Sequence, residues 1–339
     1  MGSTDMRPLL LLPEILLFLG GLVVLMSGSF LPRTRQWVAR LLAAAALLAA
    51  AVAGAVAGGG PDGWAMSGTF TLDGATAVVR VVAALAGLVV LVLAGDEIAG
   101  TARESETYAL LLFATAGTLV VGGASDLLVL AVGFLLASIP LYGLIGIART
   151  RAGTEATMKT YLLGSLFGIV LLLGITVLSG VCGTTGYGEL QTRLPDAPPA
   201  AVAAGVVAVL GGLLFKAGGV PAHFWVPDAA AGAGGAVAAF VTTVPKLGAL
   251  VAIHRLVGVL PDDLEWPLFV AVLAVGSMTL GNLAAYQQED PGGCSAGPPS
   301  ARSATCWCRS WWPAAATWRC PRCCSTSPRT RSRTSRRSR

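Results

Sequence analysis

The chain has 339 residues, of which 55% are hydrophobic and only 12% are charged, whereas about 25% of the residues of a soluble domain are charged. So few charges cannot cover the surface of a soluble fold, which excludes a soluble globular enzyme, a disordered chain and a nucleic-acid-binding protein. The composition predicts an all-α polytopic membrane protein.

The net charge of +5 combines two regions of opposite sign. Residues 1–290 hold 13 Lys and Arg against 18 Asp and Glu, whereas residues 291–339 hold ten Arg and no Lys, Asp or Glu. Six of the seven Cys and four of the eight Trp also lie in the last segment. We therefore expect a membrane module over 1–290 and a separate Arg/Cys/Trp-rich tail over 291–339.

Nine segments are long and apolar enough to cross a bilayer, because about 20 residues of helix span its hydrocarbon core. They are rich in Ala and Leu and do not alternate, which disfavours the strands of a membrane barrel. The first could be a signal peptide, but its apolar run is longer than usual and eight more spans follow, which favours its retention. The nine expected spans cover approximately residues 8–29, 36–57, 75–95, 107–123, 127–147, 158–180, 200–220, 233–254 and 267–286.

The basic residues of the short loops are distributed unequally between the two sides of the membrane. Six lie after the first, third and fifth spans, and three lie on the opposite side. Because cytoplasmic loops are enriched in Lys and Arg, this places the N-terminus outside. The six are Arg33, Arg35, Arg40, Arg103, Arg149 and Arg151, and the three are Arg7, Arg193 and Arg255.

The chain has only three lysines, and all lie in expected spans or at their edges. Lys159 begins the sixth span, Lys216 lies late in the seventh, and Lys246 lies in the middle of the eighth. A charge at mid-membrane costs at least about 2.5–3.5 kcal/mol, so it is retained for a reason. For Lys159 the alternative is snorkelling to the interface. Burial lowers the pKa of a lysine, so a buried lysine releases its proton more readily than one at the surface. Several such lysines, bridged by water molecules, would make a proton relay.

Other ionisable residues are candidates for the same relay. Glu14 follows Leu12-Pro13 in the first span, and His223 and Asp228 follow the seventh. His223 is equally compatible with a packing role.

Residues 215–228 read FKAGGVPAHFWVPD. Gly218, Gly219 and Pro221 follow Lys216 directly, and such residues interrupt a spanning helix where the segment is buried in protein or lines a cavity. Broken helices at mid-membrane form the ion sites of transporters. The alternative is an interfacial turn with Trp225 in the aromatic belt.

Six motifs together resemble the antiporter-like membrane subunits of respiratory complex I (NADH-quinone oxidoreductase), most closely the subunit N type, over residues 8–290. Subunits L and M and the related sodium/proton antiporters usually carry Ser-Ala-Gln before the Pro-x-His, where this chain has Ala217-Gly218-Gly219. The motifs are LPE at 12–14, YALLLF at 108–113, PLY at 140–142, KTYLLG at 159–164, the 215–228 segment, and GNLAA at 281–285.

The resemblance implies the first inverted repeat of a proton-translocating module with a broken seventh span. It implies that Lys216 is the central proton-carrying lysine, Lys246 the connecting lysine, Lys159 the lysine at the start of the sixth span, and His223 the Pro-x-His histidine. Electron transfer from NADH to quinone would drive the module from other subunits, which would hold NADH, FMN, iron–sulfur clusters and quinone. This chain would bind no cofactor or metal. Its partners would be other membrane-arm subunits and the lipid of a bacterial plasma membrane, and not nucleic acid.

The chain departs from the family at one position in the fifth span. The family commonly places a glutamate in this span, where it pairs with the lysine of the seventh span. When the chain is aligned through Pro140-Leu141-Tyr142, that position is Leu135. This puts efficient pumping in doubt and leaves a non-pumping alternative: a diverged or structural copy in a hydrogenase-like or duplicated complex. A stand-alone cation/proton antiporter is disfavoured by the missing Ser-Ala-Gln.

The tail is interpreted as a frameshifted continuation of the gene. Residues 301–312 read ARSATCWCRSWW, and GC-rich codons for them, read one base out of register, encode RQVGYLLVPVVV, which resembles the family's continuation. Family members continue with about five more spans, so the resemblance implies a truncated module. A zinc site at the tail cysteines, or binding of nucleic acid or anionic lipid by the final arginines, would not explain the abrupt change in composition.

Overall fold

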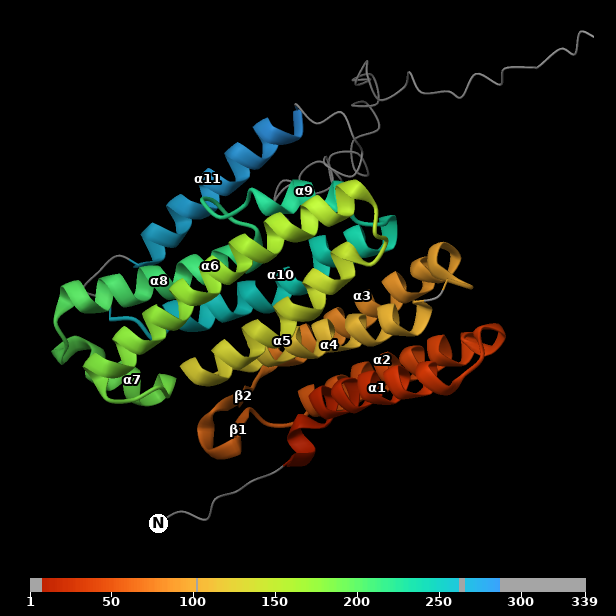
Figure 1. Ribbon diagram of the computed structural model, residues 1–339. Helices are drawn as coiled ribbons and strands as arrows, with labels where there is room; N and C mark the ends of the chain where they lie inside the picture. Colours follow the sequence, from red (N-terminus) through yellow and green to blue (C-terminus); the bar gives the residue numbers. More distant parts are fainter. Residues whose placement is uncertain (1–7, 102, 262–265, 287–339) are drawn as a thin grey trace, which may run out of the picture.

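The computed structural model describes residues 8–101, 103–261 and 266–286, which form an elongated helical bundle (Figure 1). The helices are α1 (Leu12–Phe30), α2 (Trp37–Gly58), α3 (Gly74–Ile98), α4 (Glu104–Gly123), α5 (Leu127–Gly146), α6 (Arg151–Cys182), α7 (Tyr187–Arg193), α8 (Pro199–Ala217), α9 (Trp225–Gly232), α10 (Gly235–Val257) and α11 (Trp266–Tyr286). The short strands β1 (Gly63–Ala65) and β2 (Phe70–Leu72) pair antiparallel between α2 and α3.

Eight helices of the described residues are long and apolar enough to cross a membrane. They are α1 to α6, α8 and α10, and they coincide with the first eight expected spans. α11 occupies the ninth expected span, and its apolar stretch runs only from Leu268 to Leu283. The chain is therefore an all-α, multi-pass membrane protein, as its composition predicts.

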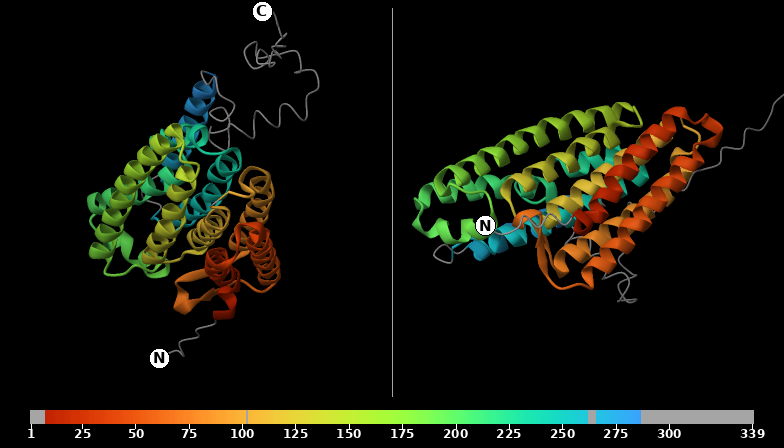
Figure 2. Two further views of the ribbon diagram at one scale, coloured as in Figure 1. Left: turned by 45° about the vertical axis from the view of Figure 1, so that its right-hand side comes forward. Right: turned by 90° about the horizontal axis from the view of Figure 1, so that it is seen from below.

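The helices lie side by side in an order that can be followed in Figures 1 and 2. α1 and α2 form one flank, α3 and α4 lie next, α5 and α10 follow, and α6, α8 and α9 form the opposite flank beside α11. α4 and α10 are the most enclosed of the spanning helices, with 78% and 72% of their apolar windows buried, against 28% for α1 and α2. The core of the bundle therefore lies around α4 and α10.

Small residues allow α4 to approach its neighbours closely. A Cβ atom on Gly117 would collide with the backbone of Ala137 in α5. The two backbones are in direct contact there, as small residues permit between membrane helices. This close contact fixes α5, which carries one of the partners of the buried lysines.

Three helices begin at side chains that accept hydrogen bonds from their first turn. Asp73 accepts from the Thr76 backbone N–H before α3 (2.8 Å), and Asp126 accepts from the Leu128 N–H in α5 (2.7 Å). Thr150 accepts from the Gly153 N–H in α6 (3.0 Å). Asp and Thr are preferred at this position because they satisfy backbone donors that have no partner within the helix.

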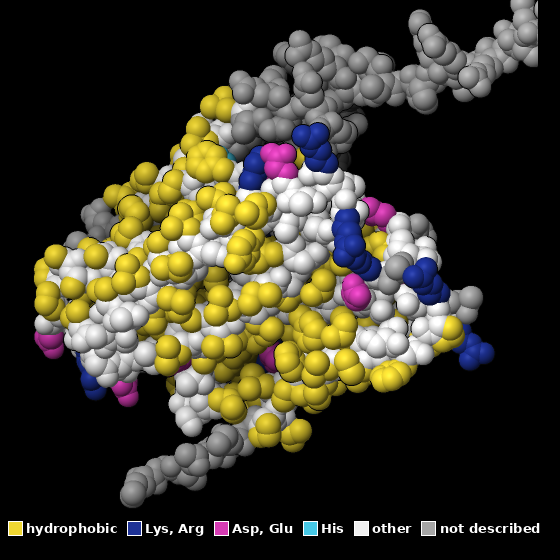
Figure 3. Space-filling view, in the orientation of Figure 1, with side chains coloured by type: hydrophobic (Ala, Val, Ile, Leu, Met, Phe, Trp, Pro, Cys, Tyr) yellow, Lys and Arg dark blue, Asp and Glu magenta, His cyan; other side chains and the backbone are white. Residues whose placement is uncertain are grey.

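The outer surface is largely apolar. Hydrophobic side chains cover most of the face shown in Figure 3, and charged side chains gather toward its edges. Large apolar residues of α5 and α6, such as Val132 and Ile169, are more than 60% exposed. Such a surface suits lipid or other membrane subunits rather than water.

Candidate functional site

The seventh spanning helix is interrupted where the sequence predicts. α8 ends at Ala217, and Gly218 adopts a left-handed conformation (φ 72°) that a residue with a side chain rarely adopts. The N–H of Gly218 donates to the Phe215 carbonyl (3.1 Å), and the N–H of Gly219 donates to the Leu214 carbonyl (2.8 Å). Helical structure resumes only at Trp225 in α9. Pro221 lies in the intervening segment, with a cis Val220–Pro221 bond.

Lys216 lies one residue before the end of α8 and is only 2% exposed. Its Nζ donates a hydrogen bond to Oγ of Ser138 in α5 (2.8 Å). Nζ also lies 5.6 Å from the centroid of the Phe134 ring, within the range of a cation–π interaction. The ammonium group is therefore held by a hydroxyl and an aromatic ring.

Aromatic side chains join the two halves of the broken helix. The Phe215 ring stacks on Phe167 of α6 and packs against Trp225 of α9, with centroid distances of 5.2 and 5.1 Å. The Trp225 indole N–H donates to the Phe215 carbonyl (3.0 Å). α9 is thereby fixed against the end of α8.

Lys246 approaches the same interruption from α10. It is 2% exposed and follows Pro245 in the helix. A Cβ atom on Gly218 would lie 3.5 Å from both Cε and Nζ of Lys246, so the lysine side chain packs over Gly218. The structure thus places Lys246 beside Gly218, two residues after Lys216, although 30 positions separate the two lysines in the sequence.

Lys159 lies apart from the two buried lysines, at the α9 end of α6. Its side chain is 48% exposed, and Nζ lies 2.8 Å from Oε1 of Glu155 and 3.0 Å from Oδ2 of Asp228 in α9. The residue therefore links α6 to α9 at a partly exposed site, and a snorkelling lysine fits this position.

His223 lies in the segment between α8 and α9 and is partly buried. Its ring packs on Phe224, with 4.4 Å between centroids. Its Nδ1 is buried without a hydrogen-bond partner among the described residues.

Glu14 lies in another part of the bundle. It accepts two hydrogen bonds from Arg80 of α3, from Nε (2.8 Å) and Nη2 (2.9 Å), and both side chains are buried. Arg80 also donates to the Leu10 carbonyl (3.0 Å) and lies over the Phe70 ring. Sequence reasoning overlooked Arg80, although an arginine inside an expected span was itself the signal for a buried partner.

Position 135 does not lie on the side of α5 that faces Lys216. Phe134 and Ser138 are 1% and 2% exposed, whereas Leu135 is 42% exposed. Leu135 belongs to the exposed stripe formed with Leu128, Val132 and Ile139. Sequence reasoning considered only the missing glutamate and overlooked the residues that contact the lysine.

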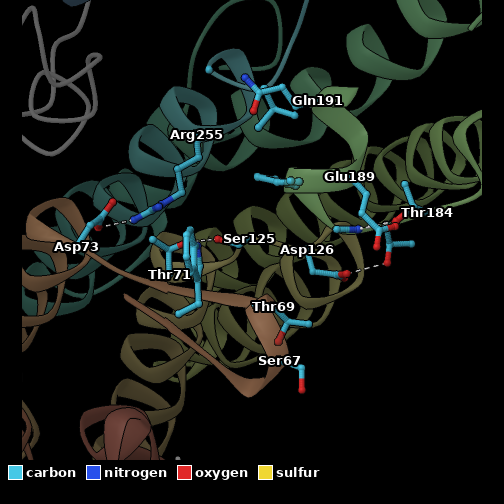
Figure 4. Close-up of a pocket in the computed structure, with 18 of the residues that line it drawn as sticks. Ser67, Thr69, Thr71, Asp73, Ser125, Asp126, Thr184, Glu189, Gln191 and Arg255 are labelled. Carbon is cyan, nitrogen blue, oxygen red and sulfur yellow. Dashed lines mark hydrogen bonds and ion pairs between the residues drawn. The ribbon is translucent and has the colours of Figure 1, made fainter. Parts of the chain in front are cut away.

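A cavity of about 790 Å³, with several polar side chains in its lining, opens at the end of the bundle that carries β1, β2 and α7 (Figure 4). At one side Arg255 donates to Asp73 Oδ1 and Thr76 Oγ1, both at 2.7 Å, and to the Gly122 carbonyl at 2.9 Å. Partial burial raises the pKa of Asp73, but hydrogen bonds from Thr76 and Arg255 and the charge of Arg255 lower it more, so the pKa lies below its usual value. The lining residues include neither Lys216 nor Lys246.

The described part of the chain contains no group of three or more His, Cys, Asp or Glu side chains that could hold a metal ion. The lining of the cavity includes Asp73, Asp126, Glu189 and His254, which do not form such a group.

Comparison with known sequences identifies the relatives of the chain. The family described as NADH:quinone oxidoreductase/Mrp antiporter, TM, matches residues 124–291. A protein of Mycobacterium sp. (strain JLS) named NADH-quinone oxidoreductase subunit N is 57% identical over 286 residues, which cover 84% of this chain and 61% of that protein. A Streptomyces griseus protein named NADH-quinone oxidoreductase subunit N 1 is 45% identical over 288 residues, with the same coverage.

Solved structures show the same fold. A chain of respiratory complex I from Thermus thermophilus with bound aureothin matches with a TM-score of 0.72 and 28% identity, over 86% of this chain and 62% of that one. A chain of the Mrp complex from Dietzia sp. DQ12-45-1b matches with a TM-score of 0.71 and 21% identity, over 85% of this chain and 33% of that one. The chain spans about three-fifths of the length of the curated relatives that it matches. On these matches, the chain belongs to the family of NADH:quinone oxidoreductase and Mrp antiporter membrane subunits, in which its named relatives are subunit N.

Proposed function

We propose that the chain is the first part of a proton-translocating membrane-arm subunit of NADH-quinone oxidoreductase. The observation that supports this proposal is the packing of Lys246 over Gly218, two residues from Lys216, with both lysines buried. Burying two cations beside a broken helix is costly, and membrane proteins retain such groups where ions or protons move.

The contacts suggest an order for the relay. Lys159, half exposed and joined to Asp228 of α9, lies where protons would enter from water. Lys216 carries them at the interruption, and Lys246 passes them on through α10. His223, in the segment between α8 and α9, would assist. Glu14 is engaged by Arg80 elsewhere in the bundle, and its part in the relay stays a prediction.

In this proposal the energy comes from electron transfer between NADH and quinone in other subunits, which also hold FMN and the iron–sulfur clusters. The proposal assigns no redox site to the chain itself. Its partners are neighbouring membrane-arm subunits and lipid. The chain lies in a bacterial plasma membrane with its N-terminus outside, which protease accessibility of an N-terminal tag in intact cells would test.

The test replaces each buried lysine in the assembled complex and measures proton pumping in inside-out membrane vesicles. We expect Lys216→Met and Lys246→Met each to lower pumping by about tenfold or more, because each removes a proton carrier. Arg151→Met is the control, since Arg151 is an exposed cation at the start of α6. Pumping that survives both lysine substitutions would overturn the proposal.

A non-pumping copy of the subunit is the second candidate, favoured by Leu135 where the family resemblance places a glutamate. In that case the Lys216→Met complex would oxidise NADH and pump protons as fast as the wild-type complex does. If restoring glutamate in Leu135→Glu increases pumping, the chain is a diverged copy that has lost part of its coupling.

We further propose that residues from about 291 onward are read in a shifted frame. The family match ends at residue 291, where the composition changes abruptly. These residues lie outside the described part of the chain. Determining the nucleotide sequence around codons 288–293 tests the proposal: an open shifted frame that encodes further apolar spans supports it, and an early stop codon in that frame overturns it.

A further inference from the structure

Adjacent residues of α5 lie on opposite faces of the helix, one buried and one exposed. Phe134 and Ser138, one helical turn apart, are buried against Lys216. Leu135 follows Phe134 but belongs to the exposed stripe, because each residue of a helix is rotated by about 100° from the last. An acidic side chain at position 135 would therefore begin on the outer face of α5, away from the lysine.

The Ser138 hydroxyl is oriented to receive the lysine. It donates its only proton to the Phe134 carbonyl (2.6 Å), which leaves its oxygen lone pairs to accept from Nζ of Lys216. Both groups are buried, so water does not compete freely for this bond. The bond also joins α5 to the end of α8, 78 residues away in the sequence.

The second contact of the ammonium is also uncharged. The Phe134 ring lies 5.6 Å from Nζ, and the carbonyl of the same residue fixes the Ser138 hydroxyl. The ion pairs of the described residues do not include Lys216. Two neighbouring groups of α5 thus occupy the place that a carboxylate partner would take.

We propose that Ser138 is the positioning residue for Lys216: its hydroxyl, backed by the Phe134 carbonyl, holds the ammonium in place of an acidic partner. This inference rests on the proposed function for its role in proton transfer. The contact itself is independent of pumping and can be measured without it.

The scarcity of lysine makes a direct measurement practical. The full chain, labelled with ¹⁵Nζ-lysine and placed in lipid nanodiscs, gives three side-chain signals, each assigned by one Lys→Arg substitution. In Ser138→Ala we expect the Lys216 signal to shift and its ammonium protons to exchange with water about tenfold faster or more, because a hydrogen bond to a charged group is lost. The Lys159 signal should not change.

Two variants separate positioning from a general loss of packing. Ser138→Thr keeps a hydroxyl at the same position and should restore the wild-type Lys216 signal. Thr115→Val removes a buried hydroxyl of α4 that donates to the Leu111 carbonyl, and should leave Lys216 unchanged. An unchanged Lys216 signal in Ser138→Ala, or the same change in Thr115→Val, would overturn the inference.

The pumping measurement then tests the role in proton transfer. In the assembled complex, Ser138→Ala should change the pH profile of pumping, and Ser138→Thr should restore it. A profile unaffected by Ser138→Ala, with pumping lost in Lys216→Met, would overturn the positioning role alone. Pumping can instead survive Lys216→Met while Ser138→Ala still shifts the Lys216 signal. In that case the contact stands and the proposed function fails.

Discussion

The carboxylate of Glu14 in α1 accepts two hydrogen bonds, of 2.8 and 2.9 Å, from the guanidinium of Arg80 in α3. The two residues are 66 positions apart, and both are buried. The pair therefore ties the first spanning helix to the third, in a part of the bundle from which water is largely excluded.

Removing one partner of this pair should destabilise the fold. Glu14→Gln leaves Arg80 charged and buried, which typically costs about 3–5 kcal/mol. The double variant Glu14→Gln/Arg80→Met should recover part of that loss, because no charge remains. Unfolding in detergent measures both, with Glu189→Gln as the exposed control. If Glu14→Gln instead lowers pumping at unchanged stability, Glu14 acts in the relay and not as a structural partner.

The link between Lys159 and Asp228 should contribute little to stability. Both side chains are nearly half exposed, so water screens the attraction between their charges. We expect Asp228→Asn and Lys159→Met each to leave the free energy of unfolding nearly unchanged. A double-mutant cycle with both changes measures the coupling. A strong coupling between the two residues would show that α9 depends on this pair for its position.

Gly218 should tolerate no side chain. In Gly218→Ala the new Cβ would lie 2.8 Å from Cγ2 of Val226, and the left-handed conformation alone costs about 1–2 kcal/mol. We expect a loss of about 2 kcal/mol or more in the free energy of unfolding. Gly211→Ala in the same helix is the matched control, because nothing lies within 4 Å of its Cβ. Equal stability of the two variants would contradict this account of the interruption.

The Asp73–Arg255 pair should make stability depend on pH in the acid range. The folded pKa of Asp73 is lowered below 3.8, so its contribution is present above that pH and is lost as the pH falls through the folded pKa. We expect the stability difference between wild type and Asp73→Asn to shrink as the pH falls below about 4. Thermal unfolding across this range measures it. A difference that stays constant would show that the Asp73 charge adds nothing.

The local features of the chain could be predicted from the sequence. Apolar length identified the spanning helices, and Gly218, Gly219 and Pro221 identified the interruption, because each depends on neighbouring residues alone. The positions of the three lysines relative to their spans followed in the same way. The family resemblance then supplied roles for these lysines that composition could not supply.

The contacts between distant helices could not be predicted in this way. The bond from Lys216 to Ser138 crosses 78 residues, and the bond from Arg80 to Glu14 crosses 66. Hydrophobic periodicity shows which face of a helix is buried but not which helix covers it. For this reason the sequence drew attention to Leu135, whereas the structure shows Phe134 and Ser138 against the lysine. The hairpin of β1 and β2 was missed because its strands are only three residues long.

The hydrogen bond from the Trp225 indole affects how the backbone at the end of α8 is satisfied. An interruption normally exposes carbonyl groups that need water, which limits it to the surface or to a wet cavity. Here the Phe215 carbonyl accepts from both the Trp225 side chain and the Gly218 backbone. The two halves of the helix thus satisfy part of each other's hydrogen bonding, so the Phe215 carbonyl at the end of α8 does not depend on water for a partner.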